Sequence, residues 1–373
     1  MKKLLVAVLS LVILSTLVSA QTPGAPARVT NERVRSESAE PSPEAKPDQS
    51  RPPAVRMVPK LPSPTVPPPW ELRNEGGASR EPENEGVDLL ASAVAILYSM
   101  GKTERAKVVA KKALPLLLNP SSDKEFYYRG VVHYVLDNYD LATDDFNKAV
   151  QMNPGMILVY DFRGDAYLEK GDYKRAIADY DTAIRLEPKT DRYIRQRGIA
   201  YTRKGDYDRA LADFNTAIRL DPQEAYTYYA RGIAYALKRD YDRALADFSE
   251  AIRLTPVKEA TEFSSGASHY YHGRGNVYST KGDYDRALAE YDTAIRLHPQ
   301  NAFSYDGRGR VYFKKGDYKR AIADFSEVIR LSPDDIEAYN NRATAYKKVG
   351  DKAKAQADRD KTAELEKQRR RKP

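Results

Sequence analysis

The chain has 373 residues, a formal net charge of +8 and no cysteine. Without cysteine, disulfides, thiolate catalysis and cysteine-ligated metals are excluded. The charge does not indicate a nucleic-acid partner, because residues 87–365 carry only +3 with both signs interspersed.

Residues 1–20 have the pattern of a signal peptide. Lys2 and Lys3 precede an apolar run that ends at Ala20, and Val18 and Ala20 are small enough to precede a cleavage site. The run is a little shorter than the ~20 apolar residues that a membrane-spanning helix needs. We therefore expect an exported protein with a cleaved signal, in the periplasm or outside the cell. The alternative is an uncleaved N-terminal anchor.

Residues 21–86 are predicted to be a disordered linker. They hold 14 of the chain's 23 prolines and few large apolar side chains, so they bury too little surface to offset the entropy of ordering. Proline-rich chains favour the extended polyproline helix and act as semi-rigid spacers. The alternative is a docking motif for a domain that binds proline-rich segments.

The rest of the chain repeats with a period of 34 residues, interrupted by one interval of 43. The period is marked by Pro120, Pro154, Pro188, Pro222, Pro256, Pro299 and Pro333. A fixed period of this length predicts stacked copies of one small helical unit. Such stacks form long binding surfaces and seldom form the converging polar pocket of an enzyme.

One copy, residues 225–256, shows why the unit is a pair of helices. Tyr228, Gly232 and Tyr235 are spaced i, i+4, i+7, as on one face of a first helix. Asp240 stands where its side chain caps a second helix, and Pro256 prevents that helix from continuing. The apolar face of the second helix consists of Tyr241, Ala244, Phe248 and Ala251. Because Gly232 is small, we expect the two helices to approach closely there.

This pattern resembles the tetratricopeptide repeat. The resemblance covers residues 123–367 as seven copies, and it implies an all-α, right-handed α-solenoid of stacked antiparallel helix pairs. The copies begin at Asp123, Ile157, Asp191, Ala225, Ser268, Ala302 and Ile336. We expect a degenerate helix pair before them at 87–122 and a basic tail after them at 368–373. The last copy has Arg359 where the others have an aromatic residue, as a polar terminal cap requires.

Position 7 of every copy is arginine, where the family usually has an aliphatic residue, and position 23 is always an acid. The arginines are Arg129, Arg163, Arg197, Arg231, Arg274, Arg308 and Arg342. The acids are Asp145, Asp179, Asp213, Asp247, Glu290, Asp324 and Asp358. Because a half-buried guanidinium needs a fixed counter-charge, we predict an ion pair between the two helices of each copy. The alternative is an arginine ladder that binds an acidic ligand.

In the tetratricopeptide family the first helices line a concave groove, and positions 2, 5, 9 and 12 of each copy face it. These positions vary between copies here, which favours a binding site for a peptide or a helix. The residues predicted to contact a partner are Tyr226, Tyr229, His269, His272, Asn276, Phe303, Arg310 and Phe313. The alternative is that they are ordinary, partly exposed side chains of a tyrosine-rich chain. An insertion at 257–267 should form a loop or lengthen one helix beside them.

Catalytic, metal and cofactor sites are not expected. His269 and His272 are spaced to share a metal ion, but no third ligand is evident. No nucleophile–base pair and no glycine-rich phosphate loop is present. The mode by which some members of the family hold a C-terminal carboxylate is also rejected, because no three successive copies carry its Lys, Asn and Arg pattern.

We therefore expect a non-catalytic scaffold in the cell envelope that binds a segment of another protein. The alternative is a module that recognises a cell-envelope glycan or peptidoglycan, with groove tyrosines stacked on the sugar rings. The basic run Arg369, Arg370 and Arg371 is either a solvated helix end or a contact to an anionic envelope polymer.

Overall fold

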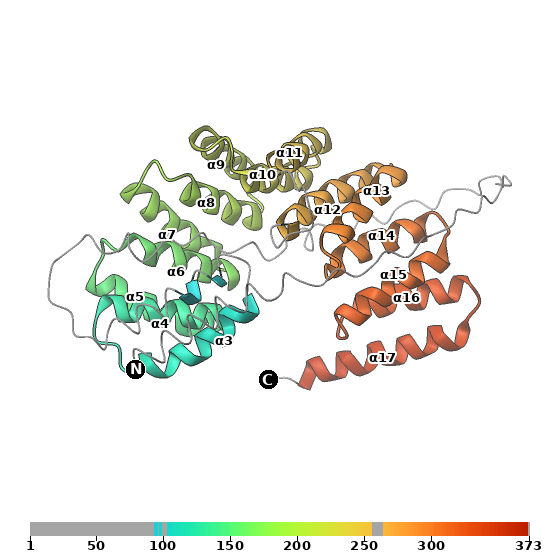
Figure 1. Ribbon diagram of the computed structural model, residues 1–373, viewed down its shortest axis with the longest axis horizontal. Coiled ribbons are helices and arrows are strands. Elements are labelled where there is room, and N and C mark those ends of the chain that lie inside the picture. Colours follow the sequence, from blue (N-terminus) through green and yellow to red (C-terminus); the bar gives the residue numbers. More distant parts are fainter. Residues whose placement is uncertain (1–92, 96, 99–102, 256–263, 372–373) are drawn as a thin grey trace, which may run out of the picture.

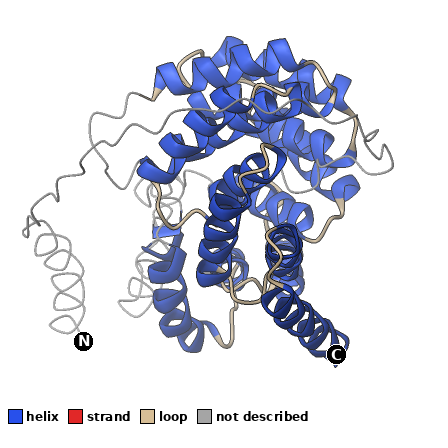
Figure 2. Cartoon of the chain, turned by 90° about the vertical axis from the view of Figure 1, so that its right-hand side faces the viewer, coloured by secondary structure: helices blue, strands red, loops and turns tan. Residues whose placement is uncertain are grey.

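The computed structural model describes residues 93–95, 97–98, 103–255 and 264–371. The predicted signal peptide, the proline-rich segment 21–86 and residues 257–263 of the insertion lie outside the described residues. The described part of the chain consists of helices and short loops and has no strand, as Figure 2 shows.

Seven antiparallel helix pairs follow one another in an open arc (Figure 1). The first helices are α4 (Asp123–Val135), α6 (Ile157–Glu169), α8 (Asp191–Lys204), α10 (Ala225–Leu237), α12 (Ser264–Lys281), α14 (Ala302–Lys314) and α16 (Ile336–Lys348). The second helices are α5 (Tyr139–Met152), α7 (Tyr173–Leu186), α9 (Tyr207–Leu220), α11 (Tyr241–Leu254), α13 (Tyr284–Leu297), α15 (Tyr318–Leu331) and α17 (Lys352–Arg371). Helix α3 (Thr103–Ala113) and the 3₁₀ turn Leu114–Leu117 precede them. This is the all-α solenoid that the period predicts.

The second helices begin where the sequence places their caps. The side chain of Asp240 accepts a hydrogen bond from the amide of Arg243 at 3.3 Å, which satisfies one free donor of the first turn of α11. Five further second helices are capped in the same way, by Asp172, Asp206, Asp283, Asp317 and Asp351. The turn before the cap needs a left-handed residue, which is Gly205 in the third copy and Arg239 in the fourth.

The two helices of a copy pack closely at the predicted glycine. A Cβ atom on Gly232 would lie only 2.9 Å from Cε1 of Phe248, so the ring occupies the space that a side chain would fill. Phe248 is fully buried. The same contact between a glycine at position 8 and an aromatic ring at position 24 recurs in copies 1 to 6. The small residue is therefore a packing requirement of the repeat.

All seven predicted arginine–acid pairs form, each between the two helices of one copy. In the fourth copy, Nε and Nη2 of Arg231 donate to the two carboxylate oxygens of Asp247 at 2.8 and 2.7 Å. The pair also joins neighbouring copies, because Nη1 of Arg231 donates to Oδ1 of Asn215 in the preceding second helix at 2.7 Å. The corresponding arginines of the third and sixth copies use Asp181 and Asp292 in that place. The predicted pairing within each copy is confirmed. The additional contact of the arginine with the preceding copy was not predicted.

Two helices extend beyond the bounds given above for the seven copies. Helix α12 begins at Ser264, four residues before the predicted start of the fifth copy, so the end of the insertion lengthens a helix. Helix α17 continues to Arg371, so residues 368–371 form the end of the last helix. None of the described helices combines the length and the apolar character that crossing a membrane requires.

Candidate functional site

The first helices form the inner side of the arc. Successive first helices touch one another along the stack, whereas successive second helices do not come into comparable contact among the described residues. In a curved stack, the elements on the inner side lie closer to one another than the elements on the outer side do. The first helices therefore line the concave face (Figure 1).

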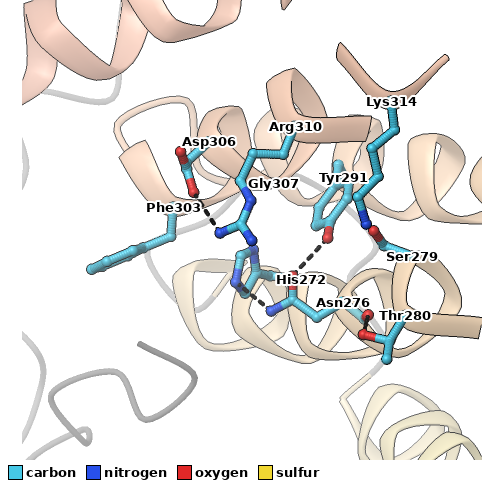
Figure 3. Close-up of a pocket in the computed structure, with 10 residues that line it drawn as sticks. All are labelled: His272, Asn276, Ser279, Thr280, Tyr291, Phe303, Asp306, Gly307, Arg310 and Lys314. Carbon is cyan, nitrogen blue, oxygen red and sulfur yellow. Dashed lines mark hydrogen bonds and ion pairs between the residues drawn. The ribbon is translucent and has the colours of Figure 1, made fainter. Parts of the chain in front are cut away.

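A pocket of about 210 Å³ opens on this face between α12 and α14 (Figure 3). It is lined by His272, Asn276, Ser279, Thr280, Tyr291, Phe303, Asp306, Gly307, Arg310 and Lys314. Four of these residues are among the predicted partner contacts. The pocket therefore lies in the fifth and sixth copies, within part of the range over which partner contacts are predicted.

The floor of the pocket is a hydrogen-bonded chain of three side chains. The hydroxyl of Tyr291 donates to Oδ1 of Asn276 at 2.6 Å, and Nδ2 of Asn276 lies 2.9 Å from Nε2 of His272 (Figure 3). Because the Asn276 oxygen already accepts, its nitrogen donates and Nε2 of His272 is the acceptor. Burial, together with the nearby His269, lowers the pKa of His272 to about 3. The imidazole is therefore neutral at physiological pH.

The rim of the pocket carries an aromatic ring and two cations. Phe303 is 48% exposed, and Figure 3 shows its ring directed away from the other labelled side chains. Arg310 lies 3.7 Å from Asp306, one turn before it on α14. Burial and the charge of Arg310 lower the pKa of Lys314, which stands four residues further along the same helix.

A second pocket of about 200 Å³ adjoins the first one along the stack. It is lined by Arg310, Phe313, Lys314, Phe325, Asn341 and Thr344. Arg310 and Lys314 thus stand between two hollows, one on each side of α14. The predicted residue Phe313 belongs to the second hollow.

The predicted residues of the fourth copy do not join this surface. Tyr229 is only 2% exposed, and its ring packs against Phe248 and Tyr270 with centroids 5.7 and 5.0 Å away. Tyr226 is half-buried beside it. The prediction took both as groove contacts, but the Tyr229 ring fills the core and the Tyr226 ring packs against it. His269 is half-buried and does not line either hollow.

A buried polar cluster further along the inner face was missed. Asp161 and Asp165 on α6 and Arg192 and Arg195 on α8 occupy groove positions of the second and third copies, and all four are buried. The signal was available, because these four charged residues stand at positions 2, 5 and 9 of copies 2 and 3, which face the groove in the family. In the described ranges, no three His, Asp or Glu side chains are placed to hold a metal ion.

Known structures resemble this chain in fold. Yeast Tom70 shares 18% identity at a TM-score of 0.55, with 80% of this chain and 63% of that chain covered. The Cut9–Hcn1 hetero-tetramer of the APC/C shares 18% at a TM-score of 0.52, with 71% and 57% covered, so the chain spans little over half of that protein. A tetratricopeptide repeat protein from Parabacteroides merdae shares 22% at a TM-score of 0.50, with 65% and 93% covered.

Sequence comparison points to the same family. No curated protein sequence matches the chain. The family model described as tetratricopeptide repeat matches residues 163–225 and 195–258, and the one described as TPR repeat matches 275–316 and 309–350. Together with the 34-residue period and the seven helix pairs, these matches show that the chain belongs to the tetratricopeptide repeat family.

Proposed function

We propose that the protein is a non-catalytic scaffold that binds a segment of another protein in its concave groove, centred on the two hollows beside α14. The observation that carries this proposal is Phe303, a half-exposed aromatic side chain on the rim of a pocket with a polar floor. Large apolar side chains beside a concave pocket are typical anchors of protein interfaces.

The chemistry of the pocket supports binding more than catalysis. His272 is neutral, and its Nε2 is engaged by Asn276, so it is not poised to exchange protons near pH 7. Asp306 is paired with Arg310. Such fixed polar groups orient a ligand, and an enzyme would need a nucleophile or base aimed into the pocket.

The cations indicate the kind of segment that fits. Arg310 and Lys314 repel each other across one turn of α14, and an acidic group between the two hollows would relieve that repulsion. We expect an extended or helical segment with apolar side chains in the hollows and an acidic residue above α14.

The N-terminal sequence supports an envelope location for this scaffold. Residues 1–20 have the signal-peptide pattern, and Arg369 and Arg370 are exposed on the last turns of α17. We propose that the chain works in the periplasm or outside the cell and that this basic helix end contacts an anionic envelope polymer.

Crosslinking with mass spectrometry in the native envelope tests the proposal. The double variant Phe303→Ala, Arg310→Ala should lose a partner protein that the wild type captures. The matched control is Leu220→Ala, Arg219→Ala, which removes an exposed apolar residue and an arginine from outer helix α9. If the folded double variant still captures every partner that the wild type captures, the proposed site is wrong. Release by soluble oligosaccharide would favour the glycan alternative.

A further inference from the structure

The proline-rich segment contains one residue that a spacer does not need. Trp70 is the only tryptophan of the chain and the only aromatic residue before Tyr98. It is followed directly by Glu71, and both residues lie outside the described part of the chain. Aromatic side chains are scarce in spacers and enriched where chains bind one another. This tryptophan beside an acid is therefore a candidate ligand for a site elsewhere in the protein.

Trp70 and Glu71 match the segment that the two hollows beside α14 require. The hollows measure about 210 and 200 Å³. They are smaller than the ~300–1,000 Å³ of small-molecule pockets, so each suits a single large side chain. The half-exposed Phe303 ring and the guanidinium of Arg310 stand at the rim. A tryptophan ring packs well on another ring, and it is the aromatic side chain that attracts a cation most strongly.

The charges of the two partners are opposite. Residues 70–86 contain five acids and two arginines. On α14, the side chain of Arg310 remains 45% exposed although Asp306 lies 3.7 Å away. Lys314 lines the same two hollows. The carboxylate of Glu71, directly beside the tryptophan, would relieve the repulsion between these two cations.

The segment is long enough to reach the hollows. Val94 and Ala95 are buried in the core of the first copy, so the described chain begins beside α4. Five steps between touching first helices lead from α4 to α14, and at about 10 Å a step the path measures roughly 50 Å. The 15 residues from Glu71 to Gly86 span up to about 50 Å when extended. The path across the open side of the arc is shorter than the path along it (Figure 1).

We propose that Trp70 and Glu71 occupy the hollows beside α14 when no partner is bound, so that the chain carries its own competitor for the groove. This inference rests on the proposed function, because the internal segment takes the place of the external one. A flexible tether holds an attached ligand at an effective concentration of about 1 mM. A segment with a dissociation constant of about 0.1 mM would then fill the site in most chains and weaken an outside partner about tenfold.

The single tryptophan makes docking measurable in the full chain. Its fluorescence, excited where tyrosine does not absorb, reports Trp70 alone. Collisional quenching by acrylamide should be at least about threefold weaker for the wild type than for Phe303→Ala, Arg310→Ala, because a docked ring is shielded. The control Leu220→Ala, Arg219→Ala should remain as protected as the wild type. Circular dichroism checks that each variant is folded.

A peptide added in trans measures the competition. A fluorescein-labelled peptide with the sequence of residues 64–76 should bind the Trp70→Ala protein about tenfold more tightly than the wild type, whose own segment fills the site. Fluorescence anisotropy gives both affinities. A peptide with Glu71→Gln should bind more weakly than its parent at low salt, and the difference should shrink as the ionic strength rises.

The outcomes separate the internal contact from the proposed function. Quenching of Trp70 that is equal in the wild type and in folded Phe303→Ala, Arg310→Ala overturns the internal contact, whether the ring is open in both or shielded in both. Protection that falls on dilution assigns the docked segment to a second copy and overturns it as well. If the double variant does not fold, Glu71→Arg replaces it and should remove the protection. Capture of no partner by Trp70→Ala, whose groove is open, refutes the proposed function even where Trp70 docks.

Discussion

Breaking one arginine–acid pair should destabilise the stack far more than breaking a surface ion pair on the same helix. In Asp247→Asn, Arg231 loses its paired charge while its side chain remains only 19% exposed. Removal of one partner from a buried pair costs about 3–5 kcal/mol. Arg231 keeps its bond to Asn215, so we expect a loss of about 2–4 kcal/mol in the free energy of unfolding.

Urea denaturation followed by circular dichroism measures this loss. Hydrogen exchange of the α10 and α11 amides adds a local measurement, because a repeat array does not always unfold in one step. The control is Glu250→Gln, which breaks a two-bonded pair with Arg253 on the exposed side of α11. The double change Arg231→Met, Asp247→Leu should cost less than either single change, since no buried charge is left unpaired. The reasoning fails if Asp247→Asn changes stability no more than Glu250→Gln does.

Two further predictions concern packing and pH. Gly232→Ala should destabilise the protein by about 1–3 kcal/mol, because the new methyl group meets the Phe248 ring. The control Gly266→Ala should be neutral or stabilising, because its methyl group would enter open space. Thermal unfolding compares the two variants. His272 has a folded pKa near 3, so the unfolded state binds its proton more readily. The contribution of neutral His272 to the free energy of unfolding is therefore complete above pH 6.5 and is lost as the pH falls. The loss at pH 5 is about 2 kcal/mol. His272→Gln should flatten this part of the stability–pH profile, and a profile as steep as that of the wild type would contradict the pKa.

The repeat itself was predictable because its structural residues recur within one chain. The cap at Asp240, the close approach at Gly232 and the pair of Arg231 with Asp247 all follow from positions that keep their residue type in nearly every copy. The third partner of the arginine was missed, because Asn215 belongs to the preceding copy and its position also holds Asp or Ser elsewhere. Contacts between copies show less clearly in sequence than contacts within one.

The groove was predictable only in part, because a residue on the inner side of the stack is not necessarily exposed. Tyr229 and His272 occupy the same position of successive copies, yet one fills the core and the other lies on the floor of a pocket. The Tyr270 ring packs on Tyr229, whereas His272 lines the pocket together with Gly307 and Arg310.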